Sequence, residues 1–444
     1  MLINASALCL EDRPWHEARR RHAYAPTTLT TLAALVPPEL AAEVFLVDET
    51  VDRVPDGFND ADLVGISAMT CDVVRAYELA DSARKQGITV ALGGYHVSFK
   101  ASEAARHADS VVIGFAEESW PRLLRDFAAG CLQPRYEFPW EDRFANALPA
   151  PRRDLLNRKR YLISGTLESS RGCPNACRFC VIPSMHHRSC STRTPDSLRN
   201  DLDNIGGQRF AFLDSNPFED AAHCELLFSL LASYGCEWYA ASSLQCIKSE
   251  AWVRSAARSG CKGLLVGFES LNQSSLCSEG KGFNKVDQYF RTIRLLHDNG
   301  IAVLGCFVFG FDRDDASVFE RTVEFVDKSG IDLVLYSIYT PFPGSPALAS
   351  LESDRRILHH DWRRYDGRHA VFVPSRMSAD QLQQGLFYAW SKTYGIGSII
   401  RRIAGVSPSP LFSLFGNLAF RFYRKTFLPE VTGGERSCAK KNPG

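Results

Sequence analysis

The 444-residue sequence lacks the features that mark several classes of protein. No uninterrupted apolar run approaches the roughly 20 residues that a helix needs to span a bilayer. The segment after Met1 has neither the basic start nor the apolar core of a signal peptide. Neither sign of charge is in excess, because Lys plus Arg and Asp plus Glu both number 51. We therefore expect a cytoplasmic protein with at most peripheral membrane contact and no nucleic-acid partner.

Fourteen cysteines in so long a chain do not form the disulfide framework of a small secreted domain, and they predict a reducing compartment. Cys173, Cys177 and Cys180 form a C-x3-C-x2-C cluster that no fourth cysteine continues. Structural zinc takes four protein ligands, and most iron–sulfur clusters take four cysteines. Three thiolates therefore favour a cubane cluster with one open iron. The alternative is a zinc knuckle whose fourth ligand is distant, such as His186, His187 or Cys190.

The first 130 residues alternate short apolar runs with helical patterns, which predicts an open parallel sheet with helices on its faces. One helix is well marked, with Asp72 as its N-cap and Gly87 just past its end. The expected strands are Met1–Asn4, Val44–Val47, Leu63–Ser67, Thr89–Leu92 and Ser110–Ile113.

Small residues follow three of these strands, in the segments 65–71, 93–98 and 114–118. Ligands of such sheets bind beyond the carboxyl ends of the strands. Small residues there allow a large planar ligand to approach the backbone. No G-x-G-x-x-G follows the first strand, which counts against a dinucleotide.

Residues 133–160 are rich in Pro, Arg and aromatic residues and read as a linker. Six strand-plus-helix units follow, too few for a closed eightfold barrel but suited to a partial one. The predicted strands are Leu162–Glu168, Phe210–Leu213, Glu237–Ala241, Gly263–Gly267, Ala302–Phe309 and Asp332–Ile338. Asn284 is the expected N-cap of one helix, and Asp315 and Gly330 bracket another. The cysteine cluster follows the first strand, at the end of a barrel where chemistry takes place.

With aromatic Phe179 before its last cysteine, the cluster matches the motif C-x3-C-x-aromatic-C. Together with the preceding sheet, the chain resembles the cobalamin-dependent radical S-adenosylmethionine enzymes over roughly residues 1 to 390. The order of Ser67, Gly93-Gly94 and Gly114 resembles the cobalamin-binding domain, in which the nucleotide tail lies between sheet and helix. The motif D-x-H-x-x-G of that domain is absent, since Asp12 and His16 have the wrong spacing.

The resemblance implies an α/β fold: a Rossmann-like cobalamin-binding domain (1–132), a linker (133–160), a partial (β/α)6 TIM-like radical SAM barrel (161–345), a mainly helical substrate-capping region (346–430) and a disordered tail (431–444). It implies a [4Fe-4S] cluster, S-adenosylmethionine and cobalamin as cofactors. The open iron would chelate S-adenosylmethionine, and one electron from a flavodoxin- or ferredoxin-type reductant would cleave it to a 5'-deoxyadenosyl radical.

The resemblance also assigns expected roles to single residues. Cys173, Cys177 and Cys180 would hold the cluster and carry the catalysis, with Phe179 and Asp214 near the cofactor. Glu269 would accept hydrogen bonds from ribose hydroxyls, or else form a structural salt bridge. The cobalamin contacts would be Ser67, Met69, Thr70, Gly93, Gly94 and Gly114. For the lower face of the cobalt, the loops with Cys71 and with Tyr95 and His96 are candidates, although packing for Cys71 and a backbone hydrogen bond for His96 are the preferred interpretations.

A helix is expected to begin near Ser378. The segment from Leu411 to Leu428 is rich in Leu and Phe beside Arg421, Arg424 and Lys425. Such a segment can lie on a membrane or cover an apolar substrate, or it can pack back on the barrel.

The leading hypothesis is a radical C-methyltransferase that uses methylcobalamin on an unactivated carbon of an apolar or natural-product substrate. The second hypothesis is an oxidative cyclase or carbon–carbon coupling enzyme that acts on a tetrapyrrole or lipid. The third is a non-catalytic cobalamin or iron–sulfur sensor.

Overall fold

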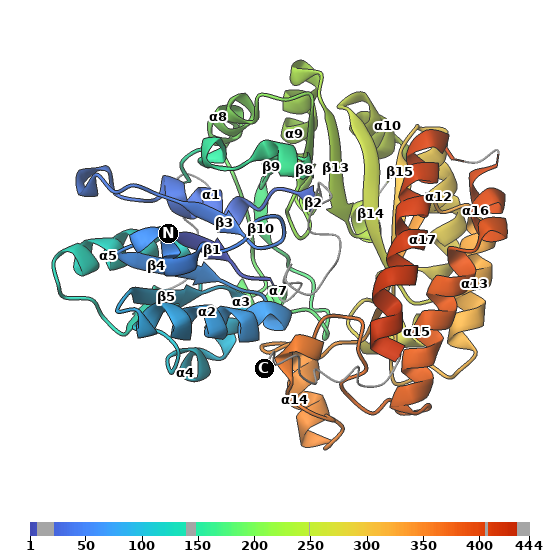
Figure 1. Ribbon diagram of the computed structural model, residues 1–444. Helices are drawn as coiled ribbons and strands as arrows, with labels where there is room; N and C mark the ends of the chain where they lie inside the picture. Colours follow the sequence, from blue (N-terminus) through green and yellow to red (C-terminus); the bar gives the residue numbers. More distant parts are fainter. Residues whose placement is uncertain (7–21, 139–147, 248, 405–406, 433–444) are drawn as a thin grey trace, which may run out of the picture. The chain divides into compact units, whose positions relative to one another are not determined.

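The computed structural model describes residues 1–6, 22–138, 148–247, 249–404 and 407–432 (Figure 1). Two compact units divide the chain. Unit 1 comprises Met1–Gly263, Pro341–Ser350 and Asp361–Asp366, and unit 2 comprises Leu264–Thr340, Leu351–His360 and Gly367–Gly444. The predicted helical region 346–430 therefore belongs to both units. Among the described residues, no helix is long and apolar enough to cross a bilayer.

The amino-terminal sheet of unit 1 has six parallel strands in the order β3-β1-β4-β5-β6-β7. The strands are β1 (Leu2–Asn4), β3 (Leu46–Asp48), β4 (Leu63–Ser67), β5 (Thr89–Gly93), β6 (Ser110–Ile113) and β7 (Arg135–Glu137). The five predicted strands are all present. β7 was not predicted, and it lies in the segment interpreted as a linker. Tyr136 buries its ring in the core of this sheet and donates its hydroxyl to Asp126 at 2.8 Å, so the sheet extends beyond residue 132.

Helices cover both faces of this sheet. α1 (Thr27–Ala34) and α5 (Ala116–Ala128) bury Leu29, Trp120 and Leu123 against Leu2 and other strand residues. α2 (Val73–Lys85) packs against β4 and β5, and Figure 1 shows it on the side of the sheet opposite α1. α3 (Tyr95–Phe99) and α4 (Ala101–Ala104) follow β5. Asp72 occupies the predicted N-cap position of α2, but its side chain makes no capping hydrogen bond there.

The second sheet has the order β16-β15-β14-β13-β12-β9. Unit 1 contains β9 (Gly165–Leu167), β12 (Arg209–Phe212) and β13 (Glu237–Ser242); β14 (Cys261–Glu269) begins in unit 1 and ends in unit 2; unit 2 contains β15 (Ala302–Phe309) and β16 (Leu333–Ile338). The predicted series of six strands is confirmed. The predicted first strand is shorter than expected, because Tyr161–Ile163 forms β8 and pairs instead with β2 (His22–Tyr24).

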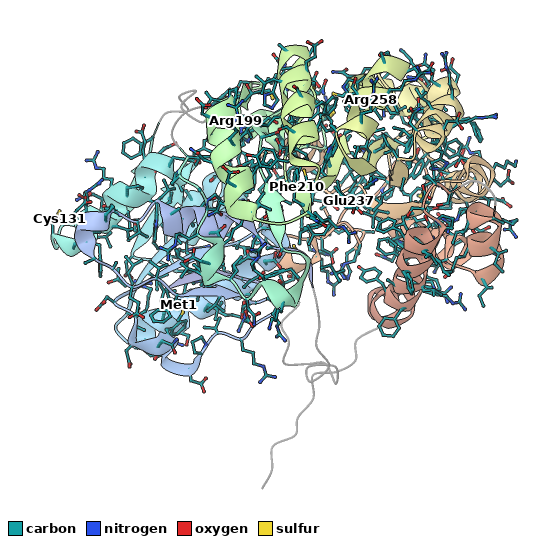
Figure 2. The ribbon with its side chains drawn as sticks, turned by 90° about the horizontal axis from the view of Figure 1, so that it is seen from above. Met1, Cys131, Arg199, Phe210, Glu237 and Arg258 are labelled. Carbon is teal, nitrogen blue, oxygen red and sulfur yellow. The ribbon has the colours of Figure 1, made fainter. Side chains whose placement is uncertain are left out.

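The unit 1 part of this sheet is covered by α8 (Pro195–Ile205), α9 (Ala221–Tyr234) and α10 (Glu250–Arg258). Aromatic rings fill its core, with Trp238 fully buried and stacked on Phe228 at 5.9 Å between ring centroids. In Figure 2, Phe210 of β12 lies among the strands and helices, whereas Arg199 of α8 and Arg258 of α10 lie at the surface. The buried faces of α8 and α9 thus pack on the part of the sheet that contains β9 and β12, the strands that lead into the candidate site.

Unit 2 contains α11 (Gln273–Ser278), α12 (Tyr289–Asp298), α13 (Val318–Ser329), α15 (Ala379–Thr393), α16 (Ile396–Ile403) and α17 (Pro410–Thr432). α15 begins as predicted, with Ser378 and Gln381 forming a reciprocal capping box. Gly330 ends α13 in the left-handed conformation, also as predicted.

Two capping predictions in unit 2 are wrong. Asn284 does not cap α12, which begins at Tyr289; its buried side chain donates to the carbonyl oxygens of Gly267 (2.9 Å) and Phe268 (3.2 Å). The N-cap of α13 is Ser317, and the Asp315 carboxylate accepts from the Ser317 amide at 3.0 Å. Asn284 thus supports the end of β14, and Asp315 supports the turn before α13; neither side chain caps its helix.

Two segments that follow β16 in sequence belong to unit 1. One begins α14 (Pro346–Ser353), and the other carries Trp362. The Trp362 indole donates to Glu103 at 3.1 Å, and its ring meets His96 edge to face at 5.1 Å. The role of residues 346–430 in capping the barrel mouth remains a prediction. Most of the predicted tail 431–444 lies outside the described residues, as do Asp12 and His16.

Candidate active site

The cysteine loop of unit 1 begins directly after a short antiparallel ladder. β10 (Ser170–Gly172) pairs with β11 (Cys190–Thr192), so that Gly172 lies opposite Cys190. Gly172 has φ +99°, and a Cβ atom at this position would lie 2.3 Å from the Ser189 carbonyl oxygen. Only glycine fits there. The ladder therefore closes the base of the loop that carries Cys173, Cys177 and Cys180.

Asp214, which follows β12, holds the turn that leads into this ladder. Its buried carboxylate accepts the Ser169 amide at 3.0 Å and the hydroxyl groups of Ser169 and Ser170 at 2.8 and 2.7 Å; the Ser170 amide also donates to it. Burial and the nearby charge of Glu168 raise the pKa of Asp214 to about 6, against the effect of these hydrogen bonds. All of these contacts are with the chain itself. They give Asp214 a positioning role, while its predicted contact with a cofactor remains a prediction.

The three thiols of the loop differ in exposure. Cys177 is buried, whereas Cys173 and Cys180 are half-buried, as is Phe179 between them. Asn175 donates its side-chain amide to the Cys173 sulfur at 3.4 Å, and the Asn216 amide lies 4.0 Å from the same sulfur.

This donor set fits a cubane cluster. Each corner iron of such a cluster takes one thiolate, and hydrogen bonds to the sulfur atoms tune its potential. Within the described ranges, no three side chains of His, Cys, Asp or Glu are placed to hold a single metal ion. The residues named for the zinc alternative lie in different environments. His186 is buried against Phe115, and burial together with Arg171 lowers its pKa to about 4, while His187 is exposed.

One carboxylate organises both amides that reach Cys173. Glu219 accepts from the Asn216 amide at 2.6 Å and from the Gln245 amide at 2.5 Å. Gln245 in turn donates to the Asn175 side-chain oxygen at 3.3 Å. The Cys246 thiol, fully buried, also donates to Glu219 at 3.1 Å. Glu219 thus fixes two donors on one cluster thiol, a role that its sequence position gave no reason to expect.

A cavity of about 300 Å³ opens at the carboxyl ends of β4, β5 and β6, between these strands and α1. Gly65, Gly93, Gly94 and Gly114 line it, together with residues of α1 and the exposed side chain of Met69. A Cβ atom on Gly114, whose φ is +78°, would meet nothing within 4 Å and would point into open space. A cavity with so few side chains along its strand edge fits the nucleotide tail of cobalamin, as predicted for this sheet.

Five of the six residues predicted to contact cobalamin line this cavity: Ser67, Met69, Gly93, Gly94 and Gly114. Thr70 does not line it, because its side chain is buried beside it. His96 does not form the backbone hydrogen bond that was the preferred interpretation for it. The fully buried His96 places Nε2 3.4 Å from Glu103, and burial lowers its pKa. Cys71 lies 3.5 Å from the carboxylate of Asp72.

Sequence reasoning missed a charged group on the wall of the cavity. Arg171, two residues before Cys173, lines the cavity with Glu117 and Glu168. It donates to Glu168 at 2.7 Å and also pairs with Glu117. Although burial acts in the opposite direction, the two carboxylates raise the pKa of Arg171. The sequence signal that could have identified Arg171 is its position two residues before the cysteine motif. The α1 threonines Thr27, Thr28 and Thr31 were missed because their helix was not predicted.

Glu269 belongs to unit 2, where it forms the salt bridge that was the structural alternative for it. Its carboxylate lies 2.5 Å from the Lys281 ammonium group, and both side chains are largely buried. Its φ is +64°, and the Ser270 amide donates to the Phe268 carbonyl at 2.9 Å across it, which forms a γ-turn. Strained turns of this kind cluster at functional sites. A contact between Glu269 and ribose remains a prediction.

The comparisons with known proteins agree with this geometry. The family description "Radical SAM superfamily" matches residues 167–326, and "B12 binding domain" matches residues 39–124. The chain is 31% identical to bacteriochlorophyllide d C-12(1)-methyltransferase of Chlorobaculum tepidum, over 87% of this chain and 86% of the relative. It is 29% identical to bacteriochlorophyllide d C-8(2)-methyltransferase of the same organism, over 94% of each chain.

These matches define a radical S-adenosylmethionine enzyme. More particularly, the chain belongs to the cobalamin-dependent branch of the radical SAM superfamily. The solved structure of the cobalamin-dependent S-adenosylmethionine radical enzyme OxsB, with aqua-cobalamin and S-adenosylmethionine bound, has the same fold, with a TM-score of 0.70 and 17% identity over 96% of this chain and 70% of that one. The predicted family, fold class and cofactor set are confirmed.

Proposed function

We propose that this enzyme transfers a methyl group to an unactivated carbon of an apolar macrocycle of the tetrapyrrole class. One observation supports the reaction type: the three-cysteine loop and the glycine-lined cavity lie in one compact unit, and Arg171 of β10, the strand that leads into the loop, lines the cavity. The substrate class is supported by the two bacteriochlorophyllide methyltransferases that match almost the whole chain.

When bound, the cluster, S-adenosylmethionine and cobalamin supply the carbon radical and the methyl group. The residues of the chain position these groups. Cys173, Cys177 and Cys180 would hold the cluster, while Asp214 fixes the turn before them. The glycines at the ends of β4, β5 and β6 leave room for the cobalamin tail, and Arg171 keeps a fixed cation at the edge of that room. Its ion pairs with Glu117 and Glu168 hold the guanidinium group at this wall.

The proposal is tested with the full chain, reconstituted without oxygen and supplied with dithionite as the one-electron reductant, bacteriochlorophyllide d and S-adenosylmethionine whose methyl group carries deuterium. The expected product is a macrocycle that carries the deuterated methyl group, analysed by mass spectrometry. A macrocycle that closes a ring or couples without gaining the label would contradict the proposal and favour the cyclase. The Cys173→Ala variant serves as the control and should yield no product.

We further propose that an acidic one-electron reductant of the flavodoxin or ferredoxin type docks beside Cys177. A second cavity of about 300 Å³ lies on this side of the loop, lined by Cys177, His187 and Arg188 among others. His187 and Arg188 of this lining are exposed, and so is Arg178, which follows Cys177 in the sequence. A basic surface beside the cluster would steer an acidic electron donor.

The reductant proposal predicts that Arg178→Glu combined with Arg188→Glu slows S-adenosylmethionine cleavage driven by flavodoxin but not cleavage driven by dithionite. Arg199→Glu, at an exposed site on α8, is the matched control. Equal losses with both electron sources would contradict the proposal, because they would indicate damage to the site itself.

We also propose a cytoplasmic location with peripheral contact to a membrane. The chain carries fourteen cysteines without the disulfide framework of a small secreted domain, which suits a reducing compartment. A substrate of low polarity favours an enzyme that works close to a bilayer.

A further inference from the structure

α17 of unit 2 buries polar residues and exposes apolar ones. Phe420 packs on Trp390 and Tyr394, but most of the other Leu and Phe side chains of α17 face outward. Ser413 and Asn417, one turn apart, are fully buried. Ser413 donates its hydroxyl to the Asp332 carboxylate at 2.7 Å, and Asn417 donates to the Asp332 carbonyl at 2.8 Å. A surface helix normally buries its apolar face.

A buried arginine completes the attachment of α17. Arg402 of α16 donates to the Asn417 side-chain oxygen at 2.6 Å and to the carbonyl oxygens of Ile331 (3.0 Å) and Thr393 (2.9 Å). Gly416 lets the helix approach Leu333, since a Cβ atom there would lie 2.8 Å from that side chain. Figure 1 shows α17 beside α15 and α16. The polar face of α17 is thus firmly docked, as one of the predicted alternatives expected.

The outward face of α17 is apolar over residues 410–424, the part of the helix whose side chains are described. Leu411, Phe415 and Leu418 are 71%, 68% and 47% exposed and recur at a spacing of four and three residues. Between Pro410 and Arg424, every exposed residue is apolar. On the neighbouring helix α16, Ile396 and Ile400 are each 60% exposed, one turn apart. Contiguous apolar surface of this kind on a soluble domain marks an interaction site.

The charge around this face identifies the partner. From Gln381 to Pro429 the sequence contains no Asp or Glu, whereas it contains Lys392, Arg401, Arg402, Arg421, Arg424 and Lys425. Arg401 is exposed beside Ile400. Arg401 forms an ion pair with Asp327 of α13. An apolar face on a segment whose own charged residues are all basic is complementary to a bilayer surface with anionic head groups.

We propose that α16 and α17 dock the enzyme on a bilayer that contains anionic lipids, with Leu411, Phe415, Leu418, Ile396 and Ile400 in the interface. The inference rests on the membrane contact proposed above and names its surface and its lipid. The hydrogen bonds to Asp332 hold the helix in place, so docking requires no rearrangement of α17.

The test is sedimentation of the full-length protein with vesicles of phosphatidylcholine, either pure or containing phosphatidylglycerol. We expect binding to the anionic vesicles that weakens in high salt. The triple variant Leu411→Asp, Phe415→Asp, Leu418→Asp should bind at least about tenfold more weakly. Leu162→Asp, at a site that is 65% exposed in unit 1, is the matched control and should bind like the wild type.

The single substitution Phe415→Ser provides a milder second variant if the triple variant unfolds, and it should show the same direction of change. Equal binding by wild type and variants would overturn the proposal, as would no binding by the wild type. A wild type that is dimeric in solution, with a monomeric triple variant, would also overturn it in favour of a second copy as the partner. No substrate is present, so the result is independent of whether methyl transfer occurs.

Discussion

The cysteine loop and the cavity between β4, β5, β6 and α1 are built by opposite means within the same unit. Side chains define the loop: Asp214 holds the turn before it, and Glu219 orients the amides around Cys173. In the cavity, by contrast, glycines at the strand ends leave one edge of the lining without side chains. A compact cluster needs ligands fixed in direction, whereas a large cofactor needs space and close backbone contact.

The comparison also explains why the two sites differ in how they can be recognised. Thiols at a fixed spacing identify their chemistry from the sequence alone. Glycines identify only where a ligand can lie, because many ligands accept the same space. Substitutions at the two sites should therefore have separable effects.

The largest effect is expected for Cys177→Ala. The variant should retain the cavity and bind cobalamin, but it should lose the cluster and all cleavage of S-adenosylmethionine. The readouts are the iron content of the reconstituted protein and the yield of 5'-deoxyadenosine. Cys277→Ala, at an exposed thiol in unit 2, should behave like the wild type. Retained cleavage in Cys177→Ala would refute the cluster assignment.

The converse effect is expected for Gly114→Ala. The new methyl group would enter the cavity, so cobalamin affinity should fall about tenfold or more while the iron content stays unchanged. Gly130→Ala is a matched control, because Gly130 also has a positive φ (+70°) and no neighbour within 4 Å of a Cβ atom, but it does not line the cavity. Both variants should lose about 1 kcal/mol of stability through backbone strain. Equal cobalamin affinity in the two variants would place cobalamin elsewhere.

A smaller effect is expected for Glu219→Gln. Without the carboxylate, the amides of Asn216 and Gln245 lose their common acceptor, and the donors on the Cys173 sulfur become less ordered. Hydrogen bonds to cluster sulfur stabilise the reduced, more negative state. The midpoint potential should therefore become more negative at unchanged iron content, as measured by redox titration with electron paramagnetic resonance. Glu225→Gln, an exposed site on α9, should leave the potential unchanged; an equal potential in Glu219→Gln would remove Glu219 from this role.

The smallest effect concerns the pH dependence that Asp214 gives to stability. Its pKa is about 6 in the folded protein and about 4 in an unfolded chain, so the folded state holds an extra proton between these values. Stability contributed by Asp214 should be full below pH about 4 and decline as the pH rises to about 6, at no more than about 1.4 kcal/mol per pH unit.

Asp214→Asn removes this dependence. The difference in free energy of unfolding between wild type and variant should change across that pH range and stay constant above pH about 7, measured by urea unfolding of the protein without cofactors. Asp196→Asn, at a carboxylate that is 91% exposed, should leave the pH profile as it is. A parallel profile for wild type and Asp214→Asn would contradict the raised pKa.

Hydrophobic runs and turn residues predicted most of the fold. Most side chains in runs such as Leu63–Ser67 and Ala302–Phe309 are buried, so the local hydrophobic pattern was enough to predict a strand there. β7 was missed because only Tyr136 among its three residues is buried, and a burial signal from one residue does not form a pattern. Asn284 was misplaced because its side chain serves the Gly267–Phe268 backbone across a loop, a contact that local capping rules do not describe.

The residues of the candidate site also fall into two groups: those that the sequence identified and those that it did not. The cysteines and the cavity glycines were recognisable because each residue type has few alternatives in its position. Glu219, Glu117 and Glu168 were not, because a carboxylate in a sequence is most often solvated. The roles of Glu219 and Glu117 also depend on Gln245 and Arg171, which lie far from them along the chain. Asp214 was singled out from its place after a strand, but its four donors became evident only from the folded turn.

The most direct test of a cobalamin-dependent methyl transfer is the ratio of products formed from S-adenosylmethionine. The reconstituted enzyme is incubated with reductant and a tetrapyrrole substrate, and 5'-deoxyadenosine and S-adenosylhomocysteine are quantified together with the methylated product. Methyl transfer predicts equal amounts of all three, since one S-adenosylmethionine provides the radical and a second provides the methyl group. Formation of 5'-deoxyadenosine and a modified substrate without S-adenosylhomocysteine would contradict it.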